Sequence, residues 1–364
     1  MLKFSKLKDI IIVLFSTVLT FAIWEFGYRA FKKREIKTEG FIDRTMLFEA
    51  GENFENHKGF FKYYPNVSIR SLTLFSKPKP KSILDLKVEY DYVIKTNNAG
   101  LVMQKDLKNK DKVFYIIGDS FTEGQGASPW FYEMENDLAI SDIKLINLGL
   151  LSTGPIQWEN LSSTLKKEFS LDVKGSVINI IPEDMKRTVR SFHPRELRCL
   201  KEIQCDYLLG FQGFRFHKNM TYKDIKSSVL NKLKKQKGMN KSFTIFLKDL
   251  LKKSYIVSNI YYYFSNSPEK INVKSNEIAL LKLKDAVKDK IFINVVSQKS
   301  INSKNYLNYN IARNLIFFLK ENNFNYTWCD IDVEDFHKYD GHPNKKGYET
   351  LRKCTENALK TIMN

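Results

Sequence analysis

Residues 113–124 read VFYIIGDSFTEG, five apolar residues followed at once by glycine, aspartate and serine. A short apolar run that ends at a glycine is typical of a buried strand in a parallel sheet. The residues after such a strand lie at the carboxyl edge of the sheet, where α/β folds bind their ligands. We therefore expect Ser120 at a functional edge, after a tight turn that Gly118 allows and near the start of the next helix.

The rest of the chain continues this alternation of strand and helix. Strands are predicted at 113–117, 144–148, 176–181, 291–296 and 326–331, and helices at 129–140, 156–169, 275–289, 306–322 and from about 344. Such alternation builds βαβ units on a parallel sheet, so the fold class is α/β. An insertion rich in lysine and aromatic residues interrupts it at about 190–274, with helices predicted at 222–236 and 242–264.

A histidine and an aspartate stand near the other end of the chain, in the segment YDGHPNKKGY at 339–348. This segment follows the last predicted strand, so it also emerges at the carboxyl edge of the sheet. A serine hydroxyl needs a base to take its proton, and the pKa of histidine suits that task near neutrality. Asp340 can accept the other ring N–H of His342 and fix its tautomer. Ser120, His342 and Asp340 together predict a catalytic triad.

These segments resemble the SGNH or GDSL hydrolases, a family of esterases, lipases and carbohydrate O-acyl hydrolases or transferases. The resemblance covers about residues 113–360, with the insertion between its halves. It implies a flavodoxin-like three-layer α/β/α sandwich with a mainly parallel sheet. It also implies that Ser120 is the nucleophile and, through its backbone N–H, one oxyanion donor. Gly149, in the segment INLG at 146–149, is implied as a second oxyanion donor, and no metal or other cofactor is implied.

One position departs from the family pattern. Where the family carries Asn-Asp after the third strand, with the Asn side chain as an oxyanion donor, this chain reads IPED at 181–184. An ionised Glu183 at that position would repel a developing oxyanion instead of stabilising it. The last motif also reads Asp-x-His where many members read Asp-x-x-His, although envelope-anchored members often have the shorter form. The triad is therefore better supported by the sequence than full activity is.

The first residues predict a membrane anchor. Residues 10–24, IIIVLFSTVLTFAIW, carry no charge, and no small-residue cleavage site follows them. The resulting domain division is an N-terminal membrane anchor with basic flanks at 1–34, a small β-containing segment at 35–111, and an SGNH hydrolase-like domain at 112–364. Basic residues flank the apolar run on both sides, so the positive-inside rule gives no orientation.

Composition limits the partners. The chain has 364 residues and a net charge of +18, with the charge spread over lysines instead of an Arg-rich or aromatic stripe, so no nucleic acid partner is expected. The cysteines lack zinc-site spacing. Cys199 could pair with Cys205, and Cys329 with Cys354, in an oxidising compartment; four reduced cysteines are the open alternative.

The expected function is that of a membrane-anchored serine esterase or O-acyl (acetyl) transferase. An anchored enzyme meets polymers and lipids at a membrane face, so acylated envelope carbohydrate or lipid is the expected substrate, with the catalytic domain on the extracytoplasmic side. The alternative, which Glu183 favours, is a catalytically weakened SGNH-like protein that binds glycan or scaffolds an envelope complex. The acyl group, the acceptor and the oligomeric state stay open.

Overall fold

The computed structural model of the protein describes residues 41, 43–127, 129–137, 143–202, 214–238, 268–298 and 310–364, together with Ser16 and Thr20. The chain divides into two compact units, one formed by Met1–Glu39 and Lys232–Ser267 and the other by Gly40–Asn231 and Pro268–Asn364. The second unit holds both large sheets and the candidate site.

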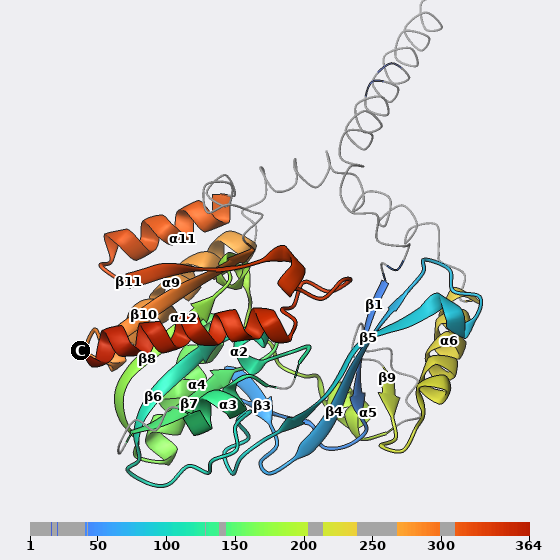
Figure 1. Ribbon diagram of the computed structural model, residues 1–364, viewed down its shortest axis with the longest axis horizontal. Coiled ribbons are helices and arrows are strands. Elements are labelled where there is room, and N and C mark those ends of the chain that lie inside the picture. Colours follow the sequence, from blue (N-terminus) through green and yellow to red (C-terminus); the bar gives the residue numbers. More distant parts are fainter. Residues whose placement is uncertain are drawn as a thin grey trace, which may run out of the picture. The chain divides into compact units, whose positions relative to one another are not determined.

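A five-stranded parallel sheet forms the centre of the second unit (Figure 1). Its strands are β6 (Lys112–Gly118), β7 (Ile143–Gly149), β8 (Asp172–Ile180), β10 (Ile291–Gln298) and β11 (Asn325–Ile331). They lie in the order β11-β10-β8-β6-β7, and every neighbouring pair is parallel. Numbered along the chain this is the order 2-1-3-4-5, which is the flavodoxin-like doubly wound arrangement. The predicted α/β class with a parallel sheet is confirmed.

Helices cover both faces of this sheet. They are α3 (Phe131–Asp137), α4 (Pro155–Glu168), α9 (Pro268–Ala286), α11 (Asn310–Glu321) and α12 (Lys345–Met363). Ser176 of β8 points toward α4 and α9, because it lines a cavity between them. Asn179, on the opposite face of the same strand, accepts a hydrogen bond from Thr355 of α12. Glu133 of α3 pairs with Arg352 of α12, which places α3 beside α12.

A second sheet precedes the parallel one along the chain. Its order is β5 (Leu86–Lys95), β4 (Ser68–Ser76), β1 (Asp43–Glu49) and β9 (Phe214–Phe216), and the hairpin β2 (Phe54–His57) and β3 (Phe60–Tyr63) lies next to it in sequence. Strands β1 to β5 fall inside the segment 35–111. They belong to the same compact unit as the parallel sheet. The division of the chain at residues 34 and 111 stays a prediction.

The insertion supplies part of this second sheet. Strand β9 pairs in parallel with β1, with Leu47 opposite Phe214. The insertion also contains α5 (Pro194–Lys201) and α6 (Tyr222–Gly238), while the helix predicted at 242–264 lies outside the described residues. The remaining short elements are α2 (Ser120–Glu123) and the 3-10 helices η1 (Ile83–Asp85), η2 (Pro182–Lys186) and η4 (Val333–Asp335).

Two further sequence expectations concern the membrane and the cysteines. Of the helices that the structure describes, none combines the length and apolar character needed to cross a membrane. The predicted anchor at 1–34 lies outside the described residues, apart from Ser16 and Thr20, which are helical. Cys329 of β11 and Cys354 of α12 form a disulfide, and Cys199 is also disulfide-bonded.

Candidate active site

Ser120 begins α2 directly after the central strand β6. The turn between them requires glycine at 118, because a Cβ there would lie 2.1 Å from Thr122 Oγ1 and 2.6 Å from the carbonyl oxygen of Asn179. Asp119 caps the short helix, since its Oδ1 accepts the backbone N–H of Phe121 at 2.9 Å. The side chain of Ser120 is therefore held at the carboxyl edge of the sheet, as the sequence predicts.

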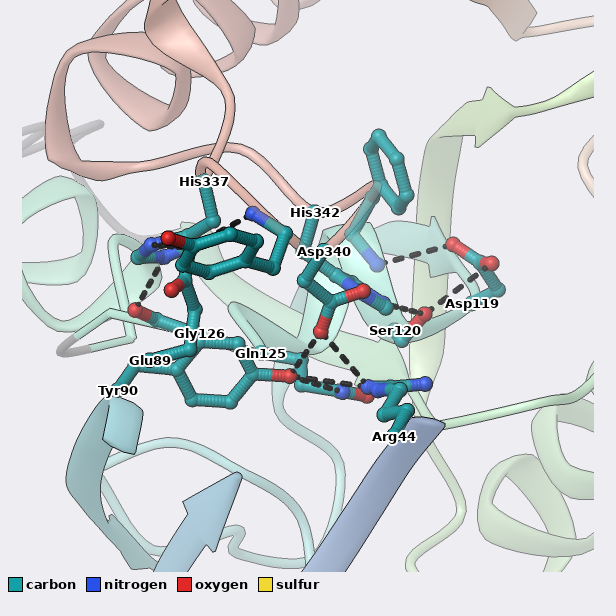
Figure 2. Close-up of polar contacts among 12 residues, drawn as sticks. Arg44, Glu89, Tyr90, Asp119, Ser120, Gln125, Gly126, His337, Asp340 and His342 are labelled. Atoms are coloured by element: carbon teal, nitrogen blue, oxygen red, sulfur yellow. Dashed lines mark hydrogen bonds and ion pairs between the residues drawn. The ribbon is translucent and has the colours of Figure 1, made fainter. Parts of the chain in front are cut away.

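The structure brings the three predicted triad residues together (Figure 2). His342 Nε2 lies 2.9 Å from Ser120 Oγ, and His342 Nδ1 lies 3.0 Å from Asp340 Oδ1. Asp340 and His342 belong to a loop between η4 and α12, which an isolated bridge between Phe336 and Pro343 closes. The arrangement matches a nucleophile, a base and an orienting carboxylate in hydrogen-bond contact.

Residues of the second sheet contact the Asp340 oxygen that does not face His342. No sequence motif marks these residues. Tyr90 of β5 donates its hydroxyl to Asp340 Oδ2 at 2.5 Å, and Arg44 of β1 forms an ion pair with the same oxygen at 3.0 Å. The Tyr90 oxygen accepts from Arg44 Nη2 and from Gln125 Nε2. Figure 2 shows these groups converging on one side of the carboxylate.

This environment lowers the pKa of Asp340 well below its usual range. Burial alone would raise that pKa, but the hydrogen bond and charge of His342, the charge of Arg44 and the Tyr90 hydrogen bond outweigh it. Asp340 is thus kept as the anion that a triad requires.

His337 supports Tyr90 from the same loop. Its Nε2 lies 2.7 Å from the carbonyl oxygen of Gly126, and its ring contacts the Tyr90 ring at a centroid distance of 4.8 Å (Figure 2). Burial lowers the pKa of His337, which favours its neutral form. His337 therefore packs against Tyr90 beside the site.

A cavity of about 470 Å³ opens in front of Ser120. Ser120 and His342 share its lining with Arg44, Ser152, Glu183 and Arg187. Phe121, Ile181, Val296 and Phe336 add apolar surface. A concave site that combines apolar walls with converging polar groups suits a small molecule. Among the described residues, no group of three or more metal-binding side chains lies close enough to hold an ion.

Gly149, the second predicted oxyanion donor, is differently engaged. Its backbone N–H donates to Asn147 Oδ1 at 2.8 Å, and a Cβ at this position would lie 2.3 Å from the backbone nitrogen of Glu123. Close packing against α2 therefore explains the glycine, and its N–H is already used. The predicted role is corrected accordingly.

Ser152 offers a free N–H instead. It lines the cavity, has a left-handed φ of 58°, and its N–H has no acceptor among the residues that the structure describes. The adjacent Leu151 N–H donates to Glu123 Oε2 at 2.6 Å, which fixes this turn against α2. Burial raises the pKa of Glu123 to about 8, against the opposing hydrogen bonds from Leu151 and Tyr63.

Glu183 lies at the cavity as an exposed residue. It forms no ion pair with any residue in the described part of the chain, although its charge contributes to raising the pKa of Arg187. Arg187 pairs instead with Asp184 and Asp119, and it lines the same cavity. The segment after β8 thus brings one anionic and one cationic side chain to the site.

The fold and the site define a class: a doubly wound α/β protein with serine, histidine and aspartate joined at the carboxyl edge of its sheet. Neither a protein-family model nor a curated protein matches the chain. Among solved structures, it is similar to a crystal structure described as a "putative GDSL-like lipase" from Bacteroides ovatus ATCC 8483. The identity is 10% and the TM-score 0.33, over 90% of this chain and 76% of that one.

Proposed function

We propose that the protein is a serine ester hydrolase of the SGNH or GDSL type. The observation that carries the proposal is the continuous contact from Ser120 Oγ through His342 to Asp340, at 2.9 Å and 3.0 Å, beside an open cavity. A hydroxyl in contact with an imidazole that a buried carboxylate orients is the arrangement that activates a serine.

Each residue has one role in the proposed reaction. Ser120 Oγ attacks the ester carbonyl carbon while His342 Nε2 takes the hydroxyl proton, and the C=O electron pair moves onto the oxygen. When the tetrahedral intermediate collapses, the bond to the alcohol oxygen breaks and His342 returns the proton to that oxygen. Asp340 holds the His342 tautomer and stabilises the imidazolium. Water or an acceptor hydroxyl then releases the acyl group by the same steps.

Two backbone N–H groups are available for the developing oxyanion. The N–H of Ser120 and the N–H of Ser152 both belong to residues that line the cavity, and neither has an acceptor among the described residues. Fixed donors aimed at a developing negative charge stabilise a transition state more than a ground state. Ser152 takes the place that the sequence analysis gave to Gly149.

Two features of the chain bear on its substrate and its cellular location. The charge-free run at 10–24 would anchor the domain at a membrane, and disulfides such as Cys329–Cys354 persist in oxidising, extracytoplasmic compartments. Acylated envelope carbohydrate or lipid is then the accessible substrate, and the acyl group could pass to water or to a carbohydrate hydroxyl. The charge-free run and the disulfide support this location and substrate class for a hydrolase and a transferase alike.

Labelling with a fluorophosphonate probe tests the proposal. The wild-type protein should be labelled at Ser120 and should hydrolyse p-nitrophenyl acetate, while Ser120→Ala and His342→Ala should each lose turnover with the fold retained. Full residual turnover in either variant would exclude the triad. A folded wild-type protein that is neither labelled nor active would favour the second candidate, a glycan-binding or scaffold protein, which the exposed Glu183 at the cavity supports.

A further inference from the structure

Arg187 reaches the cavity from the end of η2 and is held by two buried carboxylates. Its Nε donates to Asp184 Oδ1 at 2.7 Å, and its Nη2 donates to Asp119 Oδ2 at 3.2 Å. Asp184 is fully buried and Asp119 is 1% exposed, so both acceptors are fixed. Two contacts at different nitrogens fix both the position and the plane of the guanidinium.

One side of this guanidinium stays open. Nη1 has no hydrogen-bond acceptor among the residues that the structure describes, while the side chain is 27% exposed and lines the cavity with Ser120. Burial alone would lower the pKa of Arg187, but the charges of Asp184 and Asp119 outweigh it and raise that pKa. The cavity therefore contains a permanently charged donor with unused N–H groups.

A single oxygen connects Arg187 to the nucleophile. Asp119 Oδ2 accepts a hydrogen bond from Arg187 Nη2 at 3.2 Å and lies 3.3 Å from Ser120 Oγ. Ser120 and Arg187 also line the same cavity, so a substrate carbonyl that Ser120 Oγ attacks enters the space that Arg187 lines. Glu183, four residues earlier, has no donor to offer when it is ionised.

We propose that Arg187 is the third oxyanion donor of the site, in place of the neutral amide that the family resemblance leads one to expect at position 183. The inference rests on the proposed esterase function. Arg187 keeps its protons throughout: it donates hydrogen bonds to the carbonyl oxygen while the Ser120 proton moves to His342. Its positive charge also offsets the negative charge that Glu183 brings to the cavity.

The test is the kinetics of Arg187→Gln and Arg187→Lys with p-nitrophenyl acetate, beside Arg190→Gln as the matched control. Arg190 lies three residues further on and does not line the cavity. Loss of one oxyanion donor lowers kcat by roughly 10²–10³. We expect that fall for Arg187→Gln with KM changed less than about threefold, an intermediate kcat for Arg187→Lys, and wild-type kinetics for Arg190→Gln.

A second measurement separates a donor from a structural support. A boronic acid that forms a tetrahedral adduct with Ser120 should lose affinity in Arg187→Gln by about the same factor as kcat/KM, because only a donor to the oxyanion binds the adduct and the transition state alike. Since Arg187→Gln leaves buried Asp184 without its partner, the double variant Arg187→Gln/Asp184→Asn keeps the test valid if the single variant unfolds.

Three results would overturn the inference. An unchanged kcat in Arg187→Gln, or a raised KM with kcat unchanged, would exclude a transition-state role. Unchanged boronic acid affinity with a lowered melting temperature would show that Arg187 only supports Asp119. If wild type is labelled by the fluorophosphonate probe while any of these is seen, the inference alone fails; if wild type is neither labelled nor active, the esterase function fails with it.

Discussion

At the scale of single residues, Asp340 depends on side chains that arrive from another sheet. Tyr90 and Arg44 both contact Asp340 Oδ2, while Oδ1 faces His342. The contacts with Tyr90 and Arg44 hold the carboxylate in place, and the contact with His342 orients the imidazole. A carboxylate fixed on one oxygen can orient an imidazole with the other.

Tyr90→Phe tests this support. The variant removes the donor to Asp340 and the shared acceptor of Arg44 and Gln125, so Asp340 should orient His342 less well. A hydrogen bond to a charged group contributes about 1.5–3 kcal/mol, and we expect kcat to fall about tenfold or more with KM little changed. Tyr92→Phe is the control, because Tyr92 packs against Tyr90 while the hydroxyl that contacts Asp340 is that of Tyr90. Equal activity of Tyr90→Phe and the control would contradict the role.

Glu183→Asn tests the charge at the cavity. Replacing an anion near the developing oxyanion with a neutral amide should raise kcat by up to about tenfold, less at high salt because Glu183 is exposed. The comparison is with Glu168→Asn, which changes an exposed glutamate outside the cavity. A slower Glu183→Asn enzyme would show instead that Glu183 has a positive role, such as holding an acceptor hydroxyl.

Glu123 predicts a pH dependence of stability. Its pKa is raised by burial to about 8, so the folded protein holds a proton that the unfolded chain releases above about pH 4.5. The free energy of unfolding should therefore fall as pH rises through this window and level off above pH 8. Glu123→Gln should lack that decline when both proteins are unfolded with urea at pH 5, 6.5 and 8. A constant difference between them at all three values would show that Glu123 is ionised throughout.

At the scale of elements, the alternation of strand and helix could be predicted from the sequence because each parallel strand is a short apolar run. Strands predicted at 113–117 and 291–296 correspond to β6 and β10 with small changes at their ends. Ser120, Asp340 and His342 were predictable for a related reason, since each follows a strand that ends at the same edge. Pattern and topology together bring residues that are 222 positions apart to one place.

The contacts that hold Asp340 in place could not be predicted from the sequence. Tyr90 and Asp340 are 250 positions apart, with Tyr90 on β5 and Asp340 in the loop between η4 and α12, so no local spacing connects them. Gly149 was misassigned because its motif does not show that Asn147 captures its N–H. Arg187 belongs to no motif that the sequence analysis used. Its contacts with Asp119 and Asp184, which hold its guanidinium at the cavity, appear only in the folded structure.

The disulfide between β11 and α12 gives a prediction at this scale. Cys329 and Cys354 are 25 positions apart, and the chain between them carries Asp340 and His342. Closing a loop of this size stabilises a fold by about 3 kcal/mol. The variant Cys329→Ala/Cys354→Ala should lose about that much unfolding free energy in urea and part of its kcat. Reductant should lower the unfolding free energy of the wild type by breaking this disulfide, an effect that the variant cannot show because it lacks the bond. Equal stability of the two oxidised proteins would contradict the prediction.

At the scale of the whole molecule, the second sheet and the parallel sheet form one functional body within the second compact unit. Arg44 and Met46 of β1 line the cavity, and Arg44 and Tyr90 hold Asp340. A buried apolar cluster runs from β1 and the β2-β3 hairpin to Leu150 and Leu151 beside the site. The segment at 35–111 therefore completes the site as well as part of the core.

Two truncations distinguish an attached domain from an integral part. A chain that begins at residue 35 should be folded and active, because the contacts of the site among the described residues all lie after that position. A chain that begins at residue 112 loses Arg44, Tyr90 and the apolar partners of Leu150 and Leu151, so it should aggregate or bind the fluorophosphonate probe at least about tenfold more slowly. Probe labelling, circular dichroism and sedimentation of both chains measure this. If the chain from residue 112 is folded and labels at the wild-type rate, then Asp340 needs no support from the second sheet, and the integral role assigned to residues 35–111 is wrong.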